Sequence, residues 1–447
     1  MKKVEVEVTS KEMIKPSSPT PNHLRCYQLS FLDQISPMVY NPTVLFYSFH
    51  QINASTTTTI SNHLKKSLSL ALTHFYPLAG RIDGGKGFVD CIDEGVPFIE
   101  TKVKNCKLAE VVHNPIPGEL NHLVPFKLNN ITNIIFGVQL NVFQCGGVAI
   151  GACLSHQIAD ALSFFKFLNS WSSIAAKNGN LPNPQFLSSK LFPPINTSGF
   201  DPRSGITTEN VVCKLFVFDS SVVETLRDNC AIENHGDNGE EKRPTRVEAL
   251  SAFIWSRYVA VTRDHKGCYG NKKRRMHVVV HAVNLRPKME PPLPDDSFGN
   301  YYRISMTIPS LDHEEKCYGF VKQVRDQIKK IDKEYIRKLQ EGKEHLNFLK
   351  DSSERVLVKG ELVSFSFTSL CRFPLYDVDF GWGKPTWVGS PALTFKNLVV
   401  FCDTKIGGAI EAYVSLSMED MAKFEADKDL LAFVNNNNNK PYIDRLS

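Results

Sequence analysis

Short segments with a strand-like hydrophobic pattern alternate along the chain with longer segments whose apolar residues recur at helical spacing. Between residues 134 and 143, apolar and polar side chains alternate, as in a strand with one solvated face. After a glycine-rich turn at 145–147, residues 148–154 are continuously apolar, which is typical of a buried strand. Together the two segments predict a β-hairpin that ends just before His156.

Helical periodicity is found on both sides of this hairpin. Residues 60–75 carry apolar side chains at helical spacing, and residues 158–176 repeat the pattern directly after His156. Thr245 is expected to cap a third helix, with Glu248 three positions later completing a capping box. The same reasoning predicts the other elements of the second half: strands at 211–218 and 277–283, helices at 222–230, 245–261 and 318–339, and a hairpin of 399–403 with 410–416.

This succession of elements predicts a mixed α/β protein. A chain of 447 residues is longer than one hydrophobic core usually supports, so two domains are expected. The stretch 178–210 is rich in Pro, Asn, Ser and Gly and lacks periodicity, as linkers do. We therefore predict an N-terminal domain over 1–190, a crossover linker over 191–215 and a C-terminal domain over 216–447, with a disordered tail at the asparagine run 435–439.

The composition is that of an ordinary soluble globular protein, with 42% hydrophobic and 22% charged residues. A formal net charge of +5 is too small to indicate a nucleic-acid partner. The first residues alternate charge with valine, and no run of about 18 apolar residues occurs, so neither a signal peptide nor a membrane span is predicted. Eleven cysteines without a C-x-x-C pair favour reduced thiols in the cytoplasm over a disulfide framework or a zinc site.

His156 and Asp160 form an H-x-x-x-D motif where the buried strand is expected to become a helix. A histidine at such a turn can take a proton from an alcohol or an amine near neutral pH. Two other interpretations stay open at this point. The pair could share a helix face and bind a metal, although catalytic zinc sites usually have three protein ligands and no third one is evident. It could also be an ordinary packed histidine beside an aspartate that begins a helix.

A second motif, Asp379-Phe380-Gly381-Trp382-Gly383, combines two aromatic residues with two glycines. Glycines that flank a tryptophan are typical of a tight turn around a buried indole, in which the aspartate holds nearby amides or a cation. The chemistry of these residues favours a structural motif, with Gly381, Trp382 and Gly383 as its support.

An H-x-x-x-D motif near the middle of a chain, followed by D-F-G-W-G towards the C-terminus, resembles the plant BAHD acyltransferase family. Further similarities extend over nearly the whole chain, at residues 75–81, 145–147, 284–286 and 298–300. The segments 14–21 and 283–293 are most similar to the branch that holds vinorine synthase and salutaridinol acetyltransferase. The resemblance implies a two-domain, chloramphenicol-acetyltransferase-like α/β fold, in which each domain is a mixed sheet flanked by helices and a central channel runs between the domains.

The resemblance also implies a reaction and the residues that perform it. An acetyl group passes from acetyl-CoA to a hydroxyl of a plant alkaloid in a ternary complex, and His156 is the general base. Asp160 is expected to pair with Arg286 and to support the turn that carries His156. Asp379 is a further catalytic candidate of the family, which we interpret as structural. No permanently bound cofactor and no metal are expected; the partners are an acyl-CoA and a small alcohol, and the protein is expected to be a monomer.

The chain departs from the family pattern at one position. Relatives commonly have Thr-Ser-Trp before D-F-G-W-G, and the tryptophan N–H is assigned to the oxyanion in some members. Here the run is Thr368-Ser369-Leu370, and leucine cannot donate a hydrogen bond. Thr368 and Asn300 are therefore the candidate donors to the oxyanion, and Leu370 leaves space for an acyl group larger than acetyl.

The residues that contact CoA are expected in the second half. Ser251 lies where relatives often touch the nucleotide, and the basic run that includes Lys272 and Arg274 suits its phosphates, with a solvated loop as the alternative. Other functions remain open: a malonyl or other acyl donor, a terpenoid or phenolic acceptor, or a non-acylating member of the fold that binds or rearranges a small molecule.

Overall fold

The part of the chain that the computed structural model describes contains two six-stranded sheets and a small three-stranded one. Mixed sheets flanked by helices confirm the predicted α/β class. The structure describes residues 3–48, 54–83, 87–177, 181–197, 200–203, 206–207, 210–231, 243–262, 276–309, 317–342 and 362–434. The asparagine run 435–439 lies outside this part of the chain. No helix within the described ranges is long and apolar enough to cross a membrane.

The first sheet carries the predicted hairpin. Its strands, in spatial order, are β1 (Val6–Ile14), β6 (Val96–Val103), β7 (Phe136–Phe143), β8 (Val148–Ser155), β3 (Tyr40–Tyr47) and β13 (Trp387–Gly389). Only β6 and β7 are parallel among these neighbours. Every residue of β8 is buried, because β7 and β3 cover its edges and both of its faces are packed. The hairpin of β7 and β8 is confirmed, and β8 ends directly before His156.

The second sheet is built from the C-terminal half. Its order is β11 (Tyr302–Thr307), β10 (Met276–Asn284), β12 (Leu362–Ser369), β14 (Leu398–Asp403), β15 (Ile410–Ser417) and β9 (Val211–Phe218). The strands β10, β12 and β14 are parallel, and the others are antiparallel to their neighbours. The predicted hairpin of β14 with β15 is confirmed. The small sheet consists of β2 (Cys26–Gln28), β5 (Phe88–Asp90) and β4 (Arg81–Asp83).

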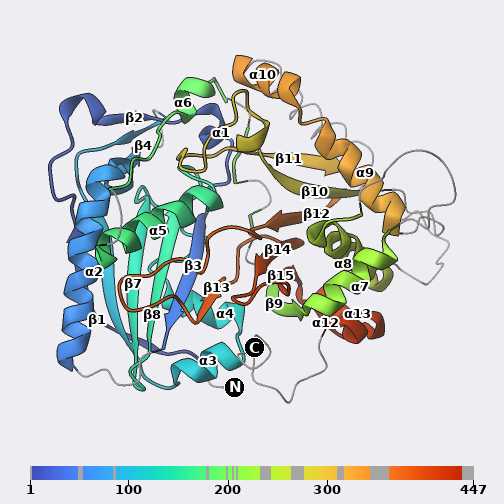
Figure 1. Ribbon diagram of the computed structural model, residues 1–447, viewed down its shortest axis with the longest axis horizontal. Helices are drawn as coiled ribbons and strands as arrows, with labels where there is room; N and C mark the ends of the chain where they lie inside the picture. Colours follow the sequence, from blue (N-terminus) through green and yellow to red (C-terminus); the bar gives the residue numbers. More distant parts are fainter. Residues whose placement is uncertain are drawn as a thin grey trace.

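Helices flank both large sheets (Figure 1). Those beside the first sheet are α2 (Ala54–His74) and α5 (Ala161–Ala176), and those beside the second are α7 (Ser220–Asn229), α8 (Arg246–Thr262), α9 (Cys317–Lys329), α12 (Met418–Glu425) and α13 (Lys428–Phe433). The remaining described helices are α1 (Phe31–Gln34), α3 (Leu108–His113), α4 (Pro117–Leu120), α6 (Ser188–Leu191) and α10 (Lys333–Glu341), with 3-10 turns η1 (Asn22–Leu24), η2 (Tyr76–Ala79), η3 (Asn121–Leu123) and η4 (Arg286–Lys288).

The capping box expected at the start of α8 is present. The Thr245 backbone N–H donates to Glu248 at 2.7 Å, and the Glu248 backbone N–H donates to the Thr245 hydroxyl at 3.2 Å. The prediction of a single helix over 318–339 was wrong, because α9 ends at Lys329 and a second helix, α10, begins at Lys333. Asp332 caps the second of these helices by accepting from the Tyr335 backbone N–H at 2.8 Å. Local capping therefore overrides a helical periodicity that continues through the break.

The cysteine expectation needs one correction. Cys230, at the end of α7, and Cys317, at the start of α9, form a disulfide. The other cysteines in the described ranges are not disulfide-bonded. Spacing along the chain could not reveal this pair, because it joins residues 87 positions apart.

The two halves of the chain exchange a segment. After β12 the chain leaves the second sheet, and its strand β13 pairs with β3 at the edge of the first sheet before β14 returns to the second. The indole of Trp387 stacks on Phe46 at 5.1 Å between ring centroids. The D-F-G-W-G motif lies in this exchanged segment, between β12 and β13. The domain bounds remain a prediction. The exchanged segment adds a second place, besides the predicted linker, at which the chain passes between the two halves.

Candidate active site

His156 lies on the turn between β8 and α5, where the sequence predicted it. The backbone N–H of His156 donates to Val39 at 2.9 Å, and that of Ile158 donates to Ser155 at 3.1 Å, so hydrogen bonds hold both ends of the turn. The imidazole is half-buried and stacks on the ring of Tyr302, 5.3 Å between centroids. Since Tyr302 begins β11, the histidine lies where the first sheet meets the second.

The environment of His156 favours its neutral form. Burial lowers the pKa of the imidazole below its ordinary value of 6.5, although the Asp160 charge and nearby hydrogen-bond groups oppose this effect. An imidazole that is neutral at pH 7 can accept a proton, as a general base must. Its Nδ1 atom is buried and has no hydrogen-bond partner among the described residues.

Asp160 and Arg286 form the ion pair that the resemblance predicted. Arg286 donates from Nη1 to Oδ2 of Asp160 at 2.7 Å and from Nη2 to Oδ1 at 3.1 Å. Backbone N–H groups of Ser163 and Tyr301 donate to the same carboxylate at 2.9 and 3.0 Å. Burial alone would raise the pKa of Asp160, but the charge and hydrogen bonds of Arg286 outweigh it and leave that pKa lowered. Both oxygens are committed, so they are not free to share a metal with His156.

Asp160 is also the N-cap of α5. The predicted helix began at Ile158, but the observed helix begins three residues later, at Ala161. His156 therefore lies outside the helix, and the interpretation in which it shares a helix face with Asp160 was wrong. A capping carboxylate that is also tied to Arg286 fixes both the start of α5 and the turn before it.

Arg286 is almost completely buried, with 1% of its surface exposed. Besides Asp160, its Nη2 donates to the Ser163 hydroxyl at 2.8 Å and to the Ser297 carbonyl at 2.9 Å. Its guanidinium lies 4.8 Å from the centre of the Tyr301 ring. These contacts offset the free-energy cost of removing the arginine charge from water. A buried arginine without such partners would leave that cost uncompensated.

The structure corrects the expectation for Asn300. Its side chain is completely buried, and its Nδ2 donates to Asp33 at 2.9 Å and to the backbone carbonyl of His156 at 2.8 Å. Both amide hydrogens are thereby used, so Asn300 has none left for an oxyanion. It holds the backbone of His156 instead. Asp33 and Tyr302 were both missed by the sequence reasoning; for Asp33, the S-x-x-D capping pattern that starts at Ser30 was an available signal.

Thr368 and Leu370 stay predictions as substrate contacts. Thr368 is half-buried on β12, and strand alternation places it on the same face of the second sheet as Tyr302, two strands away at roughly 10 Å. Leu370 follows β12, donates its backbone N–H to Phe401 at 2.8 Å and packs against the first core. Its side chain offers no donor, as the sequence indicated.

The D-F-G-W-G motif is a self-contained turn. Asp379 Oδ1 accepts from the backbone N–H groups of Gly381 and Gly383, both at 2.8 Å. Both glycines have positive φ, at 100° and 104°, which side-chain-bearing residues rarely adopt. Phe380 packs against Trp171 at 4.8 Å between ring centroids. The structural interpretation of Gly381, Trp382 and Gly383 is supported by this geometry.

This motif lies far from His156, which corrects the inclusion of Asp379 among the catalytic candidates. Gly381 lies against Ala176, the last residue of α5, whereas His156 precedes the first turn of that helix. The helix spans 16 residues, so the two sites are separated by roughly 20 Å along its axis. Asp379 cannot touch reacting atoms at His156 from there.

The candidate CoA contacts are not brought together. Ser251 is completely buried inside the second core, with 0% of its surface exposed, so a nucleotide cannot reach it in this conformation. Lys272 and Arg274 lie outside the described residues. All three assignments remain predictions.

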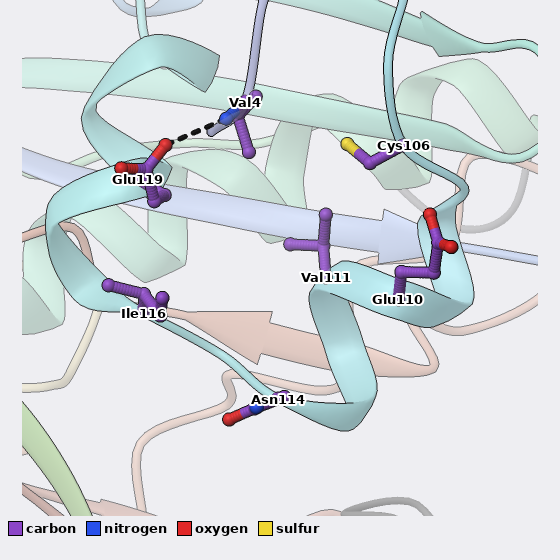
Figure 2. Close-up of a pocket in the computed structure, with 7 residues that line it drawn as sticks. All are labelled: Val4, Cys106, Glu110, Val111, Asn114, Ile116 and Glu119. Atoms are coloured by element: carbon purple, nitrogen blue, oxygen red, sulfur yellow. Dashed lines mark hydrogen bonds between the residues drawn. The ribbon is translucent and has the colours of Figure 1, made fainter. Parts of the chain in front are cut away.

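A separate cavity of about 270 Å³ opens at the first sheet, beside α3 and α4 (Figure 2). Its wall contains a hydrogen bond from the Val4 backbone N–H to Glu119 at 2.7 Å. The lining residues are Val4, Cys106, Glu110, Val111, Asn114, Ile116 and Glu119. None of the candidate catalytic residues lines it, so it belongs to a different part of the molecule from His156.

Comparison with known proteins gives the family. A family model described as the Transferase family matches residues 4–431. Stemmadenine O-acetyltransferase of Catharanthus roseus is 36% identical over 432 residues, covering 95% of this chain and 97% of the relative. Limonoid 21-O-acetyltransferase of Citrus sinensis is 35% identical over 445 residues, covering 97% and 99%. The crystal structure of vinorine synthase, an enzyme of Rauvolfia serpentina, matches with a TM-score of 0.81 and 33% identity, covering 98% of this chain and 100% of that one.

The chain belongs to the Transferase family, that of the BAHD acyltransferases, and it is an acyltransferase. The resemblance drawn from the two motifs is confirmed, with vinorine synthase among the relatives as expected. The match to the vinorine synthase structure also confirms the two-domain, chloramphenicol-acetyltransferase-like fold.

Proposed function

We propose that the protein transfers an acetyl group from acetyl-CoA to a hydroxyl of a plant alkaloid. The observation that carries the proposal is the half-buried His156, whose pKa burial lowers, on a turn that the Asp160–Arg286 pair holds. The relatives support the substrate class, because one is named for the acetylation of stemmadenine and is 36% identical. The family likeness supports an acyl-CoA as co-substrate.

The reaction follows from the protonation state of the histidine. Nε2 of His156 removes the proton of the acceptor hydroxyl while the oxygen attacks the thioester carbonyl, since an alcohol is a poor nucleophile without a positioned base. The tetrahedral oxyanion then collapses, the carbon–sulfur bond breaks, and CoA leaves as a thiolate that takes the proton from His156. The sum is an acetyl ester and free CoA, with no covalent enzyme intermediate. Binding both substrates together in the channel between the domains supplies the proximity.

The oxyanion needs a donor that Leu370 cannot provide. The Thr368 hydroxyl is the proposed donor, because Thr368 shares a sheet face with Tyr302 and Asn300 has no hydrogen left to donate. The leucine also leaves room for a bulkier acyl group, so malonyl-CoA or a larger donor is the alternative.

A terpenoid alcohol is the second candidate acceptor. Limonoid 21-O-acetyltransferase is 35% identical, almost as similar as the stemmadenine enzyme. A phenolic alcohol has no comparable relative among those compared above. The non-acylating alternative has lost its basis, because the chain is an acyltransferase.

We also propose a cytoplasmic monomer that binds an acyl-CoA and one small alcohol, with Ser251, Lys272 and Arg274 as candidate CoA contacts. The disulfide of Cys230 with Cys317 is the one observation that counts against this location, because such bonds are rare in the reducing cytoplasm. Alkylation of freshly extracted protein, followed by peptide mapping, measures whether these two thiols are free.

Incubation with labelled acetyl-CoA and a panel of alkaloid and terpenoid alcohols tests the proposal. We expect label to pass to an alkaloid, and His156→Ala to slow the transfer by about 10²- to 10⁴-fold while CoA binding persists. Transfer only to a terpenoid, or only from malonyl-CoA, would replace the acceptor or the donor in the proposal. Full activity of His156→Ala would remove its chemical basis.

A further inference from the structure

We infer that Asp33 and Asn300 are positioning residues that hold the backbone of His156 and select the tautomer of its ring for proton transfer. The inference rests on the proposed function, in which His156 is the general base, and it adds two residues that neither motif contains. Asp33 lies in α1, His156 follows β8 and Asn300 precedes β11. The three residues meet only in the folded protein.

Asp33 is a buried carboxylate whose donors in the described part of the chain are all uncharged. Its Oδ2 accepts from the Ser30 backbone N–H at 2.8 Å and from the Ser30 hydroxyl at 2.7 Å, which closes the capping box of α1. Its Oδ1 accepts from Nδ2 of Asn300 at 2.9 Å and from the Asn300 backbone N–H at 3.3 Å. Burial raises the pKa of Asp33 to about 6, while these hydrogen bonds oppose the rise. Above that pH the carboxylate is charged and strengthens the bond from Asn300.

Asn300 passes this constraint on to the histidine. One hydrogen of its Nδ2 points to Asp33, so the other is directed to the carbonyl oxygen of His156, 2.8 Å away. Asp33 and Asn300 are both completely buried, so water does not compete for the bond between them. The turn at His156 is therefore fixed from two sides: Asp160 and Arg286 hold its end, and Asn300 holds the histidine itself.

The remaining polar atoms complete the argument. Asn300 Oδ1 and His156 Nδ1 are both buried, and neither has a hydrogen-bond partner among the described residues. Burial lowers the pKa of His156, and the Asn300 side chain is among the groups that raise it, as an acceptor beside the ring does. Both atoms are satisfied if Nδ1 carries the proton and donates it to Asn300 Oδ1 when the site tightens around substrate. That tautomer leaves the lone pair of Nε2 free to accept the alcohol proton.

Steady-state kinetics and nitrogen NMR of labelled histidine test the inference. Asn300→Ala is expected to lower kcat by about 100-fold and Asp33→Asn by about 10-fold, with little change in KM, because the groups that hold the reacting residue orient it. The acid limb of kcat should shift to lower pH in Asn300→Ala, since the group that raises the pKa of His156 is gone. The NMR spectrum should show the Nδ1–H tautomer in the native protein and a mixture in Asn300→Ala.

The matched control is Asn141→Ala. Asn141 is equally buried, and its amide donates to backbone carbonyls of Leu123 and Ala149 in the first sheet. Its loss should reduce stability and leave kcat of the folded fraction, the pH limb and the tautomer unchanged. The inference is overturned if Asn300→Ala behaves like this control. Should Asn300→Ala fail to fold, the near-isosteric Asp33→Asn decides: native kcat and a native tautomer there overturn it too. Activity of His156→Ala, by contrast, would refute the proposed function itself.

Discussion

Arg286 donates hydrogen bonds to both carboxylate oxygens of Asp160, at 2.7 and 3.1 Å, across 126 positions of sequence. Asp160 begins α5, while Arg286 begins η4, which follows β10 of the second sheet. One ion pair thus connects the turn that carries the histidine to the other half of the chain. We propose that the pair supports the turn at His156 and takes no part in the chemistry.

Removal of His156 tests the assignment of the base. His156→Ala should lower kcat/KM by about 10²- to 10⁴-fold, the range that a positioned general base contributes. The fold should persist, because the ring is only half-buried and its stacking partner Tyr302 is held by β11. Acyl transfer rates, together with far-ultraviolet circular dichroism, check both statements. A rate within threefold of the native enzyme contradicts the assignment.

Breaking the ion pair of Asp160 with Arg286 should act mainly by lowering the free energy of unfolding. Asp160→Ala leaves the charge of Arg286 buried without its partner, and such a change costs about 3–5 kcal/mol of unfolding free energy. Urea unfolding measures this loss. The exposed pair of Arg337 with Glu334 is the control, and Arg337→Ala should leave the stability almost unchanged, because water screens an exposed pair. An Asp160→Ala variant as stable as the control variant would show that the pair is not needed.

The pH dependence of kcat/KM should have an acid limb below pH 6.5. Burial lowers the pKa of His156, so the base stays neutral and active until the pH falls below 6.5, the ordinary pKa of histidine. The Asp160 charge raises that pKa, hence Asp160→Asn should move the limb to still lower pH. A pH profile of the initial rates decides; a limb above 6.5, or a shift upward in the variant, is the contrary result.

Glu411 should make stability fall as the pH rises from about 4.5 to about 8. It is completely buried, accepts from the Trp387 indole at 3.1 Å and the Tyr413 hydroxyl at 2.9 Å, and burial raises its pKa to about 8. A carboxyl whose folded pKa lies above its unfolded value of 4.5 contributes stability below pH 4.5, and this contribution is lost as the pH rises towards 8. Glu411→Gln stays neutral and should lose less in thermal midpoint between pH 6 and pH 9. Equal losses in both proteins would show that Glu411 is already ionised at pH 6.

The D-F-G-W-G turn should matter for folding and not for chemistry. Asp379→Ala removes the acceptor of the Gly381 and Gly383 amides, at a cost of about 1–3 kcal/mol, because two backbone groups lose their partner. The kcat of the folded fraction should stay within about threefold of the native value, since the motif lies roughly 20 Å from His156. Thermal unfolding and active-site-normalised rates separate the two effects. A loss of kcat without a loss of stability would return Asp379 to the catalytic residues.

Elements with a local signature were predictable. The alternation over 134–143 and the apolar run 148–154 predicted β7 and β8. The pattern of apolar residues along a strand shows which of its faces are buried. The capping box of Thr245 with Glu248 could likewise be predicted, since its hydrogen bonds join residues only three positions apart. The helix predicted at 318–339 was wrong because Asp332 caps a second helix inside an unbroken periodicity.

The sequence by itself determined the family and the position of His156, through two motifs whose spacing follows the fold. Tertiary structure alone decided what Asn300 does and which cysteines join. Asn300 meets Asp33 and His156 across 267 and 144 positions, so the use of its amide hydrogens depends on how distant segments pack. The sequence does not show which partner a hydrogen-bonding group will have, because the energy that selects the partner arises only when both groups are buried together.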